Sequence, residues 1–190
     1  MRGRSRIEKD RLFFVEEESM KVLLDELLPR LLPQNIRFQV IPHQGKSDME
    51  KSIPRKLRGW REPGVTFVIL RDNDNADCAI IKEQLATLCD QNGYPDTLIR
   101  IVQQELELWY LGDLAAVGKA YQNNTLHRKQ SRNPYRTPDN IGNPKQILRQ
   151  LVPVYDPITG AEKIAVHMDI VNNRSHSFHV FVNGLRNLAF

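Results

Sequence analysis

Acidic residues directly follow two apolar segments of the chain, where their side chains could bind a metal ion. Glu16 follows the run from Leu12 to Val15, and Asp72 and Asp74 follow the run from Val65 to Leu70. Carboxylates that converge repel one another unless protons or cations lie between them. Oxygen ligands with few His or Cys neighbours favour Mg²⁺ or Mn²⁺ over zinc. This pattern predicts a magnesium-dependent site for phosphoryl transfer or hydrolysis.

Each of these acidic groups also has a purely structural interpretation. The glutamates that follow Glu16 could charge the first turn of a helix, where they are favourable against its dipole. Asp72 and Asp74 could form an Asx turn and a helix cap. Further along the chain, Glu107 and Asp113 stand six residues apart on an expected helix, so at most one of them would reach a metal. Glu107 is the better candidate because it is nearer to the end of the preceding strand.

Basic residues gather in two stretches that could contact a phosphate backbone. No carboxylate occurs from Leu114 to Pro138, and the basic residues of that segment are Lys119, Arg128, Lys129, Arg132 and Arg136. A second run follows Lys46 and consists of Lys51, Arg55, Lys56, Arg58 and Arg61. If the acids bind cations, the remaining surface is more positive than the formal net charge of +4, and nucleic acid is the expected partner. Solvated helix faces explain either run equally well.

Alternating strands and helices must position these residues. Apolar runs predict strands at Leu12–Val15, Ile36–Ile41, Val65–Leu70 and Leu98–Val102. Periodicity and capping signals predict helices from Glu18 to Pro33, from a capping box at Ser47 with a kink or restart at Pro54, from Asp77 to about Gly93, and from Glu105 to Val117. The third strand is apolar or β-branched throughout, which indicates burial on both faces. We therefore expect an α/β fold with a central, mainly parallel sheet flanked by helices, whose strand carboxyl ends form the binding crevice.

The remainder of the chain has a different composition. Residues 122–144 are rich in Asn, Pro, Arg and Lys and predict a long loop, whereas residues 144–152 and 178–188 predict helices that pack back on the core. A length of 190 residues favours one domain. We therefore expect a single domain, with an α/β core at 1–117 and a loop plus an α-helical C-terminal extension at 118–190.

The composition of the chain also indicates the cellular compartment in which the protein functions. No apolar run approaches the roughly 18 residues that a membrane span needs. The apolar stretch after the basic start is too short for a signal peptide. Cys78 and Cys89 have neither zinc-site spacing nor the pattern of a disulfide framework. We expect a cytoplasmic protein without a membrane partner.

The order of the motifs resembles the Toprim domain of topoisomerases, primases and OLD-type nucleases. The resemblance is closer to a bacterial Toprim-like family of unknown function, often encoded beside an ABC-type or OLD-like ATPase and associated with defence. It covers nearly the whole chain and rests on Val15-Glu16 with Ser19, Gly45-Lys46, Asp72-Asn73-Asp74, Glu105 to Trp109 with Asp113, Asn143-Pro144-Lys145, and Ser175 to Phe178. The chain departs from the Toprim pattern at Glu17, where Gly is usual, and at Met20, where a second Glu is often found.

The resemblance implies a Mg²⁺-dependent nuclease that cleaves the phosphodiester bonds of DNA or RNA and acts with a partner ATPase in antiviral defence. Glu16 would be a metal ligand or general acid–base, and Asp72 and Asp74 would be metal ligands; together they would be the catalytic residues. Glu107 would be a further ligand of Mg²⁺ or Mn²⁺. The residues expected to contact nucleic acid are Lys46, Arg128, Lys129, Arg132 and Lys145.

Two other functions fit parts of the sequence. A binding module could keep the fold and the acidic site but act by docking to an ATPase or to nucleic acid, and Glu17 in place of Gly supports this alternative. A phosphoacceptor receiver domain also collects acids around Mg²⁺, but Val102-Gln103-Gln104 provides no hydroxyl after the fourth strand. The choice between DNA and RNA and the formation of a homo-oligomer stay open.

Overall fold

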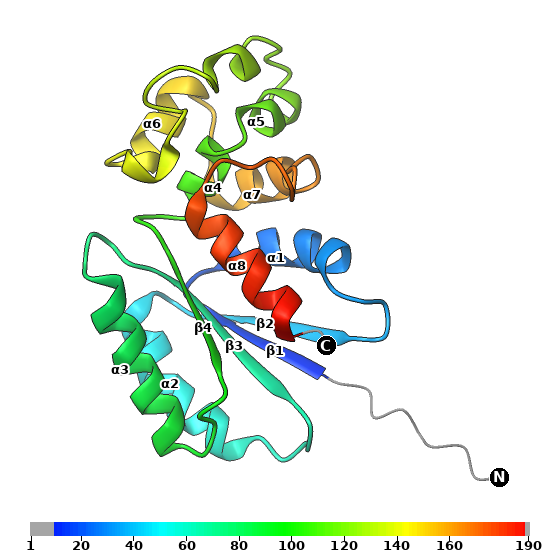
Figure 1. The fold of residues 1–190 in the computed structure, drawn as a ribbon, viewed down its shortest axis with the longest axis vertical. Helices are drawn as coiled ribbons and strands as arrows, with labels where there is room; N and C mark the ends of the chain where they lie inside the picture. The colour runs from blue at the N-terminus through cyan, green and yellow to red at the C-terminus, as the bar shows by residue number, and fades with distance from the viewer. Residues whose placement is uncertain (1–9, 189–190) are drawn as a thin grey trace, which may run out of the picture.

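A four-stranded, all-parallel sheet forms the centre of the computed structural model, which describes residues 10–188 (Figure 1). The strands are β1 (Asp10–Val15), β2 (Arg37–Pro42), β3 (Thr66–Asp72) and β4 (Leu98–Val102), arranged in the order β2-β1-β3-β4. β1 and β3 are therefore the inner strands. The predicted α/β fold with a parallel sheet is confirmed.

Helices cover both faces of this sheet. Successive residues of a strand point to opposite faces, and in β1 Phe13 and Val15 join one buried cluster while Leu12 and Phe14 join another. The first cluster is covered by α1 (Glu18–Leu31) and α8 (His176–Leu188), and the second by α2 (Lys46–Gly59) and α3 (Cys78–Gln91) (Figure 1). Burial of the inner strands on both faces explains their continuous apolar sequence.

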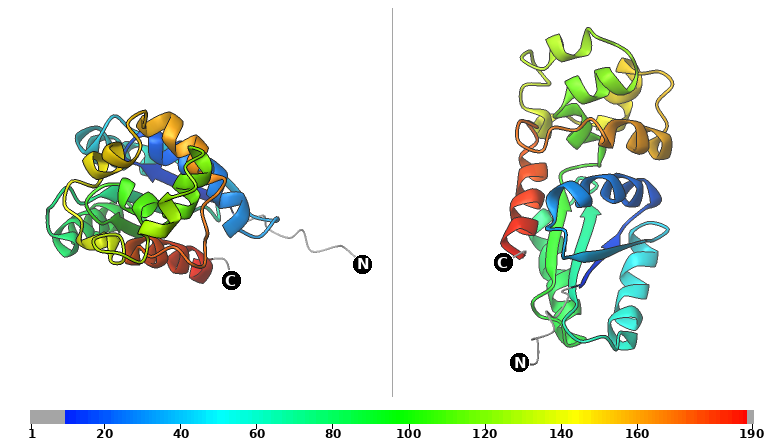
Figure 2. Two further views of the ribbon diagram at one scale, coloured as in Figure 1. Left: turned by 90° about the horizontal axis from the view of Figure 1, so that it is seen from above. Right: turned by 90° about the vertical axis from the view of Figure 1, so that its right-hand side faces the viewer.

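A separate group of helices follows the end of β4. It contains α4 (Glu107–Leu111), α5 (Leu114–Ala120), α6 (Pro144–Leu151) and α7 (Pro157–Ala165), with the short 3₁₀ helices η1 (Leu126–Lys129) and η2 (Pro138–Asn140) between α5 and α6. Figure 2 shows this group stacked on the sheet layer, with α8 descending from it along the sheet. We call residues 107–165 the helical lobe. Its position beyond the carboxyl end of β4 brings it close to the expected crevice.

Several expectations about individual elements are corrected. The helix expected from Glu105 to Val117 is two helices, because the chain breaks at Gly112 and Asp113 caps the second one. The N-cap of α2 is Gly45 rather than Ser47, and the helix continues through Pro54. α7 was not anticipated. These differences leave the order of strands unchanged.

Candidate metal centre

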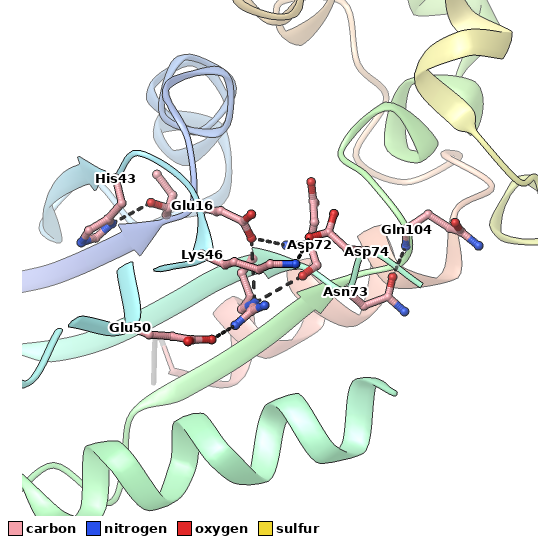
Figure 3. A network of polar contacts seen from close by, with 10 residues as sticks. Glu16, His43, Lys46, Glu50, Asp72, Asn73, Asp74 and Gln104 are labelled. Atoms are coloured by element: carbon pink, nitrogen blue, oxygen red, sulfur yellow. Dashed lines mark hydrogen bonds and ion pairs between the residues drawn. The ribbon is translucent and has the colours of Figure 1, made fainter. Parts of the chain in front are cut away.

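The parallel direction of the strands brings the predicted acidic residues to one edge of the sheet. Glu16 follows β1 directly, Asp72 is the last residue of β3, and Asp74 lies two residues beyond it. Oε2 of Glu16 accepts a hydrogen bond of 3.2 Å from the backbone N–H of Asp72. Figure 3 shows the three side chains converging there. Glu16 is thus fixed directly against the strand that carries the other two acids.

Asp72 is the most deeply buried member of this group, with 8% of its surface exposed. Its Oδ1 atom has no hydrogen-bond partner among residues 10–188. Burial raises the pKa of Asp72 well above its ordinary value, and the charges of Glu16 and Glu17 raise it further. Burial and the charge of Asp74 also raise the pKa of Glu16, although the Arg71 guanidinium partly opposes them. The site therefore concentrates negative charge around an oxygen that a cation or proton would satisfy.

Asn73 fixes the loop between the two aspartates. Its backbone N–H donates to the carbonyl of Val102 over 3.0 Å, and its Oδ1 accepts from the N–H of Gln104 over 2.5 Å. Asp74 has a positive φ of 47° and donates its own N–H to the carbonyl of Gln104. The loop after β3 is thereby joined to the loop after β4. Asp72 lies within the strand and caps no helix, and the cap of α3 is Asp77 as expected.

Two basic side chains neutralise part of the acidic group. Nζ of Lys46, at the start of α2, lies 3.1 Å from Oδ2 of Asp74. Arg71 is buried and places Nε 3.8 Å from Oε2 of Glu16, while its Nη1 contacts Glu50 at 2.5 Å. Lys46 was expected near phosphate and does reach the centre. Arg71 was not anticipated, although a charged residue at the end of an apolar strand is a signal that could have identified it.

His43 supports the same edge of the sheet from β2. Its ring Nδ1 lies 2.8 Å from the carbonyl oxygen of Val15, the residue before Glu16. Its other ring nitrogen lies 2.7 Å from Nζ of Lys56. Burial and the nearby Lys56 lower the pKa of His43, so the ring is neutral at pH 7 and Nδ1–H donates to Val15. His43 was another residue that the sequence did not reveal, because its partner is a backbone carbonyl.

Glu107 forms a second acidic group in the helical lobe. It is 2% exposed, and its Oε1 accepts a hydrogen bond of 2.9 Å from the hydroxyl of Tyr155. Nζ of Lys145 lies 3.7 Å from the same oxygen and 3.8 Å from Oε1 of Glu105. Burial raises the pKa of Glu107, and the charge of Glu107 in turn contributes to the raised pKa of Asp72. The helical lobe therefore brings Glu107 and Lys145 towards the centre.

Asp113 has a different role from Glu107. It is the N-cap of α5, where Oδ1 accepts from the N–H of Ala116 over 2.9 Å, and Oδ2 accepts from the N–H of Asp169 over 2.7 Å. Both oxygens are thus engaged in structural hydrogen bonds. Of the two acids that the sequence offered on this segment, Asp113 is therefore a structural cap, and the proposal of a metal ligand stays with Glu107.

The basic residues of the long loop lie apart from the acidic centre. Arg128 and Lys129 are in η1, and Arg132 follows it; all are exposed on the helical lobe. Within residues 10–188 the ion pairs of the two acidic groups are made by Lys46, Arg71 and Lys145, and by none of these three side chains. The loop itself is held by Gln130, whose Nε2 donates to the carbonyls of Leu111 and Tyr135. The structure therefore presents these cations to solvent from an anchored loop.

The acidic side chains do not form a closed ligand set on their own. Within residues 10–188, no three His, Cys, Asp or Glu side chains are arranged as a group that could hold a metal ion. Mg²⁺ commonly uses only one or two protein carboxylates and completes its coordination with water and substrate phosphate. The observed oxygens fit this kind of open site, provided that Lys46 moves away from Asp74.

No helix of the described chain has both the length and the apolar character that a membrane crossing requires. No curated protein and no solved structure matches the sequence. Residues 15–186 match the model of a family described as Domain of unknown function (DUF4276), and this match includes all the acidic residues of the centre. Because the match spans most of the described chain, the protein belongs to the DUF4276 family.

Proposed function

We propose that the protein is a Mg²⁺- or Mn²⁺-dependent nuclease that hydrolyses phosphodiester bonds at Glu16, Asp72 and Asp74. The observation that carries this proposal is the buried Oδ1 atom of Asp72, which has no hydrogen-bond partner within residues 10–188. Such an atom is costly unless a proton or a cation binds it. The neighbouring carboxylates supply the oxygen ligands that a hard divalent cation prefers. The resemblance to Toprim domains supports the same assignment.

The protein side chains suggest a division of roles. A bound divalent cation would polarise the phosphate and make water a stronger nucleophile. Glu16, whose pKa is raised by burial and by Asp74, is a stronger base than an ordinary glutamate and is suited to take a proton from the attacking water. Lys46 and Lys145 would bind non-bridging phosphate oxygens, since both ammonium groups already lie beside carboxylates of the two acidic groups.

The nucleic acid would extend from the centre onto the helical lobe. Lys145 begins this path at α6, and the exposed cations Arg128, Lys129 and Arg132 could continue it. Contacts of this kind release counterions from the phosphate backbone and make affinity depend on salt. An ATPase partner in bacterial defence is part of the proposal through the resemblance alone.

A cleavage assay on the full chain tests the proposal. Wild-type protein should cleave DNA or RNA only with Mg²⁺ or Mn²⁺, and Asp72→Asn should abolish both cleavage and calorimetric metal binding. Asp77→Asn is the matched control, because it removes one charge five residues away while Asn retains the N-cap of α3. The assay is repeated with an ABC-type or OLD-like ATPase added. A wild type that binds neither cation would overturn the assignment of the centre.

A docking module is the second candidate function. The incomplete ligand set favours it, because fewer protein oxygens hold a metal less firmly for catalysis. Glu17 also stands where Toprim domains usually have Gly. This candidate predicts metal binding without cleavage under every partner condition, whereas the nuclease predicts that both are lost together in Asp72→Asn.

A further inference from the structure

The ion pair between Lys46 and Asp74 joins α2 to the loop after β3 (Figure 3). Its two atoms lie 3.1 Å apart, and the side chains are 56% and 41% exposed. Exposed pairs of this kind contribute little to folding because water competes with both partners. The Lys46 ammonium is therefore a cation that can leave Asp74 at low cost.

At the start of α2, the Lys46 ammonium could instead bind an anion together with the first amides of the helix. Its N-cap is Gly45, with a φ of 87° and no side-chain cap, and a Cβ built there would meet no atom within 4 Å. The N–H of Gly45 donates to the carbonyl of Glu16 over 3.0 Å, which ties the helix start to the acidic centre. The first amides of a helix have no intrahelical acceptor and favour an anion. Lys46 extends from this same uncapped turn of a 14-residue helix.

The oxygen on which the proposed metal centre rests belongs to the residue two positions before Asp74. Oδ1 of Asp72 is buried without a hydrogen-bond partner in the described chain, and Asp72 is more than nine-tenths buried. A divalent cation that bound this oxygen would also attract the carboxylate of Asp74, two residues away. It would then compete with the Lys46 ammonium, because two cations at one exposed carboxylate repel each other.

We propose that Lys46 is exchanged between Asp74 and substrate: a divalent cation displaces its ammonium from Asp74, and the freed ammonium, with the first amides of α2, binds a phosphate group of the nucleic acid. This inference rests on the proposed metal centre and adds its coupling to substrate. Each ligand makes the other bind more tightly, because the metal frees the phosphate-binding group and the phosphate removes the competitor of the metal.

The metal half of the exchange is tested by titrating MgCl₂ into the full chain without nucleic acid. Lys46→Met should tighten Mg²⁺ binding about two- to fivefold, the range expected when an exposed ion pair no longer has to break. Lys46→Arg keeps the charge and should remain close to wild type. Lys51→Met is the matched control, because it removes an exposed lysine from the same helix. Unchanged or weaker Mg²⁺ binding by Lys46→Met would overturn the exchange.

The phosphate half is tested with a fluorescent single-stranded oligonucleotide, using CaCl₂ in place of MgCl₂ to limit cleavage. Lys46→Met should weaken binding and reduce the slope of log affinity against log salt by about 0.7, the value for one phosphate contact on a single strand. Calcium should increase oligonucleotide affinity more in wild type than in the variant. Equal enhancement in both proteins would contradict the coupling.

The two proposals fail in different ways. A wild type that binds no divalent cation would refute the metal centre itself. A wild type that binds Mg²⁺ and loses it in Asp72→Asn, together with a Lys46→Met protein whose Mg²⁺ affinity is unchanged, would refute only the exchange.

Discussion

Asp72 shows at the residue scale how a buried carboxylate opposes folding stability. Burial raises its pKa, so between the ordinary value and the raised value the folded chain binds more protons than the unfolded chain. Stability therefore falls as pH rises through that window, since the buried carboxylate must become charged. The raised pKa of Glu16 acts in the same direction. A divalent cation would reverse this loss by binding only the folded, ionised form.

Asp72→Asn should therefore stabilise the metal-free protein at pH 8. Removing the buried charge should raise the melting temperature by about 3 °C, corresponding to roughly 1 kcal/mol in a chain of this size. The gain should shrink at pH 5, where protonation already relieves part of the charge. Thermal unfolding at both pH values checks this, with Asp77→Asn as the control. A variant that is less stable than wild type at pH 8 would show that the Asp72 charge is already compensated.

Tyr155→Phe should destabilise the helical lobe through Glu107. The variant removes the 2.9 Å hydrogen bond to a buried carboxylate and leaves that oxygen with Lys145 as its remaining neighbour. Hydrogen bonds to charged groups contribute about 1.5–3 kcal/mol, so we expect a loss near 2 kcal/mol. The loss should be larger at pH 8 than at pH 5, because only the ionised form of Glu107 needs the donor.

Urea denaturation at the two pH values measures this difference. Tyr94→Phe is the matched control, since its ring packs against Phe67 in the other core cluster and lies away from Glu107. A pH-independent loss in Tyr155→Phe would indicate a packing role for the ring instead of a hydrogen bond to a carboxylate.

The candidate site residues that the sequence identifies are those next to the ends of strands. Glu16 and Asp72 follow from the rule that parallel strands end at one edge, and the structure brings them together through the Asp72 N–H. Arg71, His43 and Tyr155 could not be identified in this way. Their roles depend on partners that are distant in sequence or belong to the backbone.

At the scale of elements, strong apolar runs were more informative than capping signals. β4 begins and ends where the sequence predicted, because three of its five residues are β-branched and favour a strand. The capping box at Ser47 was wrong: Asp48 bonds the N–H of Gln44 instead, and the helix starts earlier at Lys46. On α3, Ile81 is buried whereas the adjacent Ile80 is 55% exposed, so only one of these two apolar residues packs in the core.

The break between α4 and α5 depends on close packing against a distant segment. A Cβ at Gly112 would lie 2.2 Å from Oδ1 of Asn173 and 2.8 Å from the backbone nitrogen of Ser175. The Asn173 amide also donates to the carbonyl of Trp109 over 2.8 Å, so it cannot easily move aside. Periodicity alone predicted one continuous helix, because nothing local in the sequence reports that contact.

Gly112→Ala should consequently destabilise the protein by about 1–3 kcal/mol, the usual cost of overpacking. Gly59→Ala is the control, since a Cβ at that position meets no atom within 4 Å and alanine is the better helix former. Chemical denaturation of both variants gives the comparison. Equal stabilities for the two alanine variants would mean that the segment around Asn173 shifts freely.

At the scale of the whole molecule, charge is divided between the two parts of the fold. The acidic centre lies at the carboxyl edge of the sheet, while the basic loop lies on the helical lobe stacked above that sheet (Figure 2). Nucleic acid bound at the centre could reach the basic loop without passing over the helices that cover the two faces of the sheet. The lobe would then serve as an electrostatic extension of the crevice.

Replacing Arg128, Lys129 and Arg132 together by alanine should weaken nucleic-acid binding and flatten its salt dependence. Three lost contacts on duplex DNA would reduce the slope by up to about 2.7. Fluorescence anisotropy across a salt series measures this slope, and Lys82→Ala reports the effect of one exposed lysine on α3 outside the proposed path. An unchanged slope in the triple variant would leave these cations as a solvated surface.

The two ends of the described chain are neighbours in space. The guanidinium of Arg11, in the first strand, donates to the carbonyl of Leu188, in the last helix, at the side of the sheet opposite the acidic edge. A short peptide link could therefore join residue 10 to residue 188 on the side of the sheet away from the acidic centre. Such a circular chain would have fewer unfolded conformations and so a higher melting temperature. The circular chain could then be cut at other surface loops to give circular permutants. Metal binding by each permutant would show which loops must stay intact for the acidic centre to form.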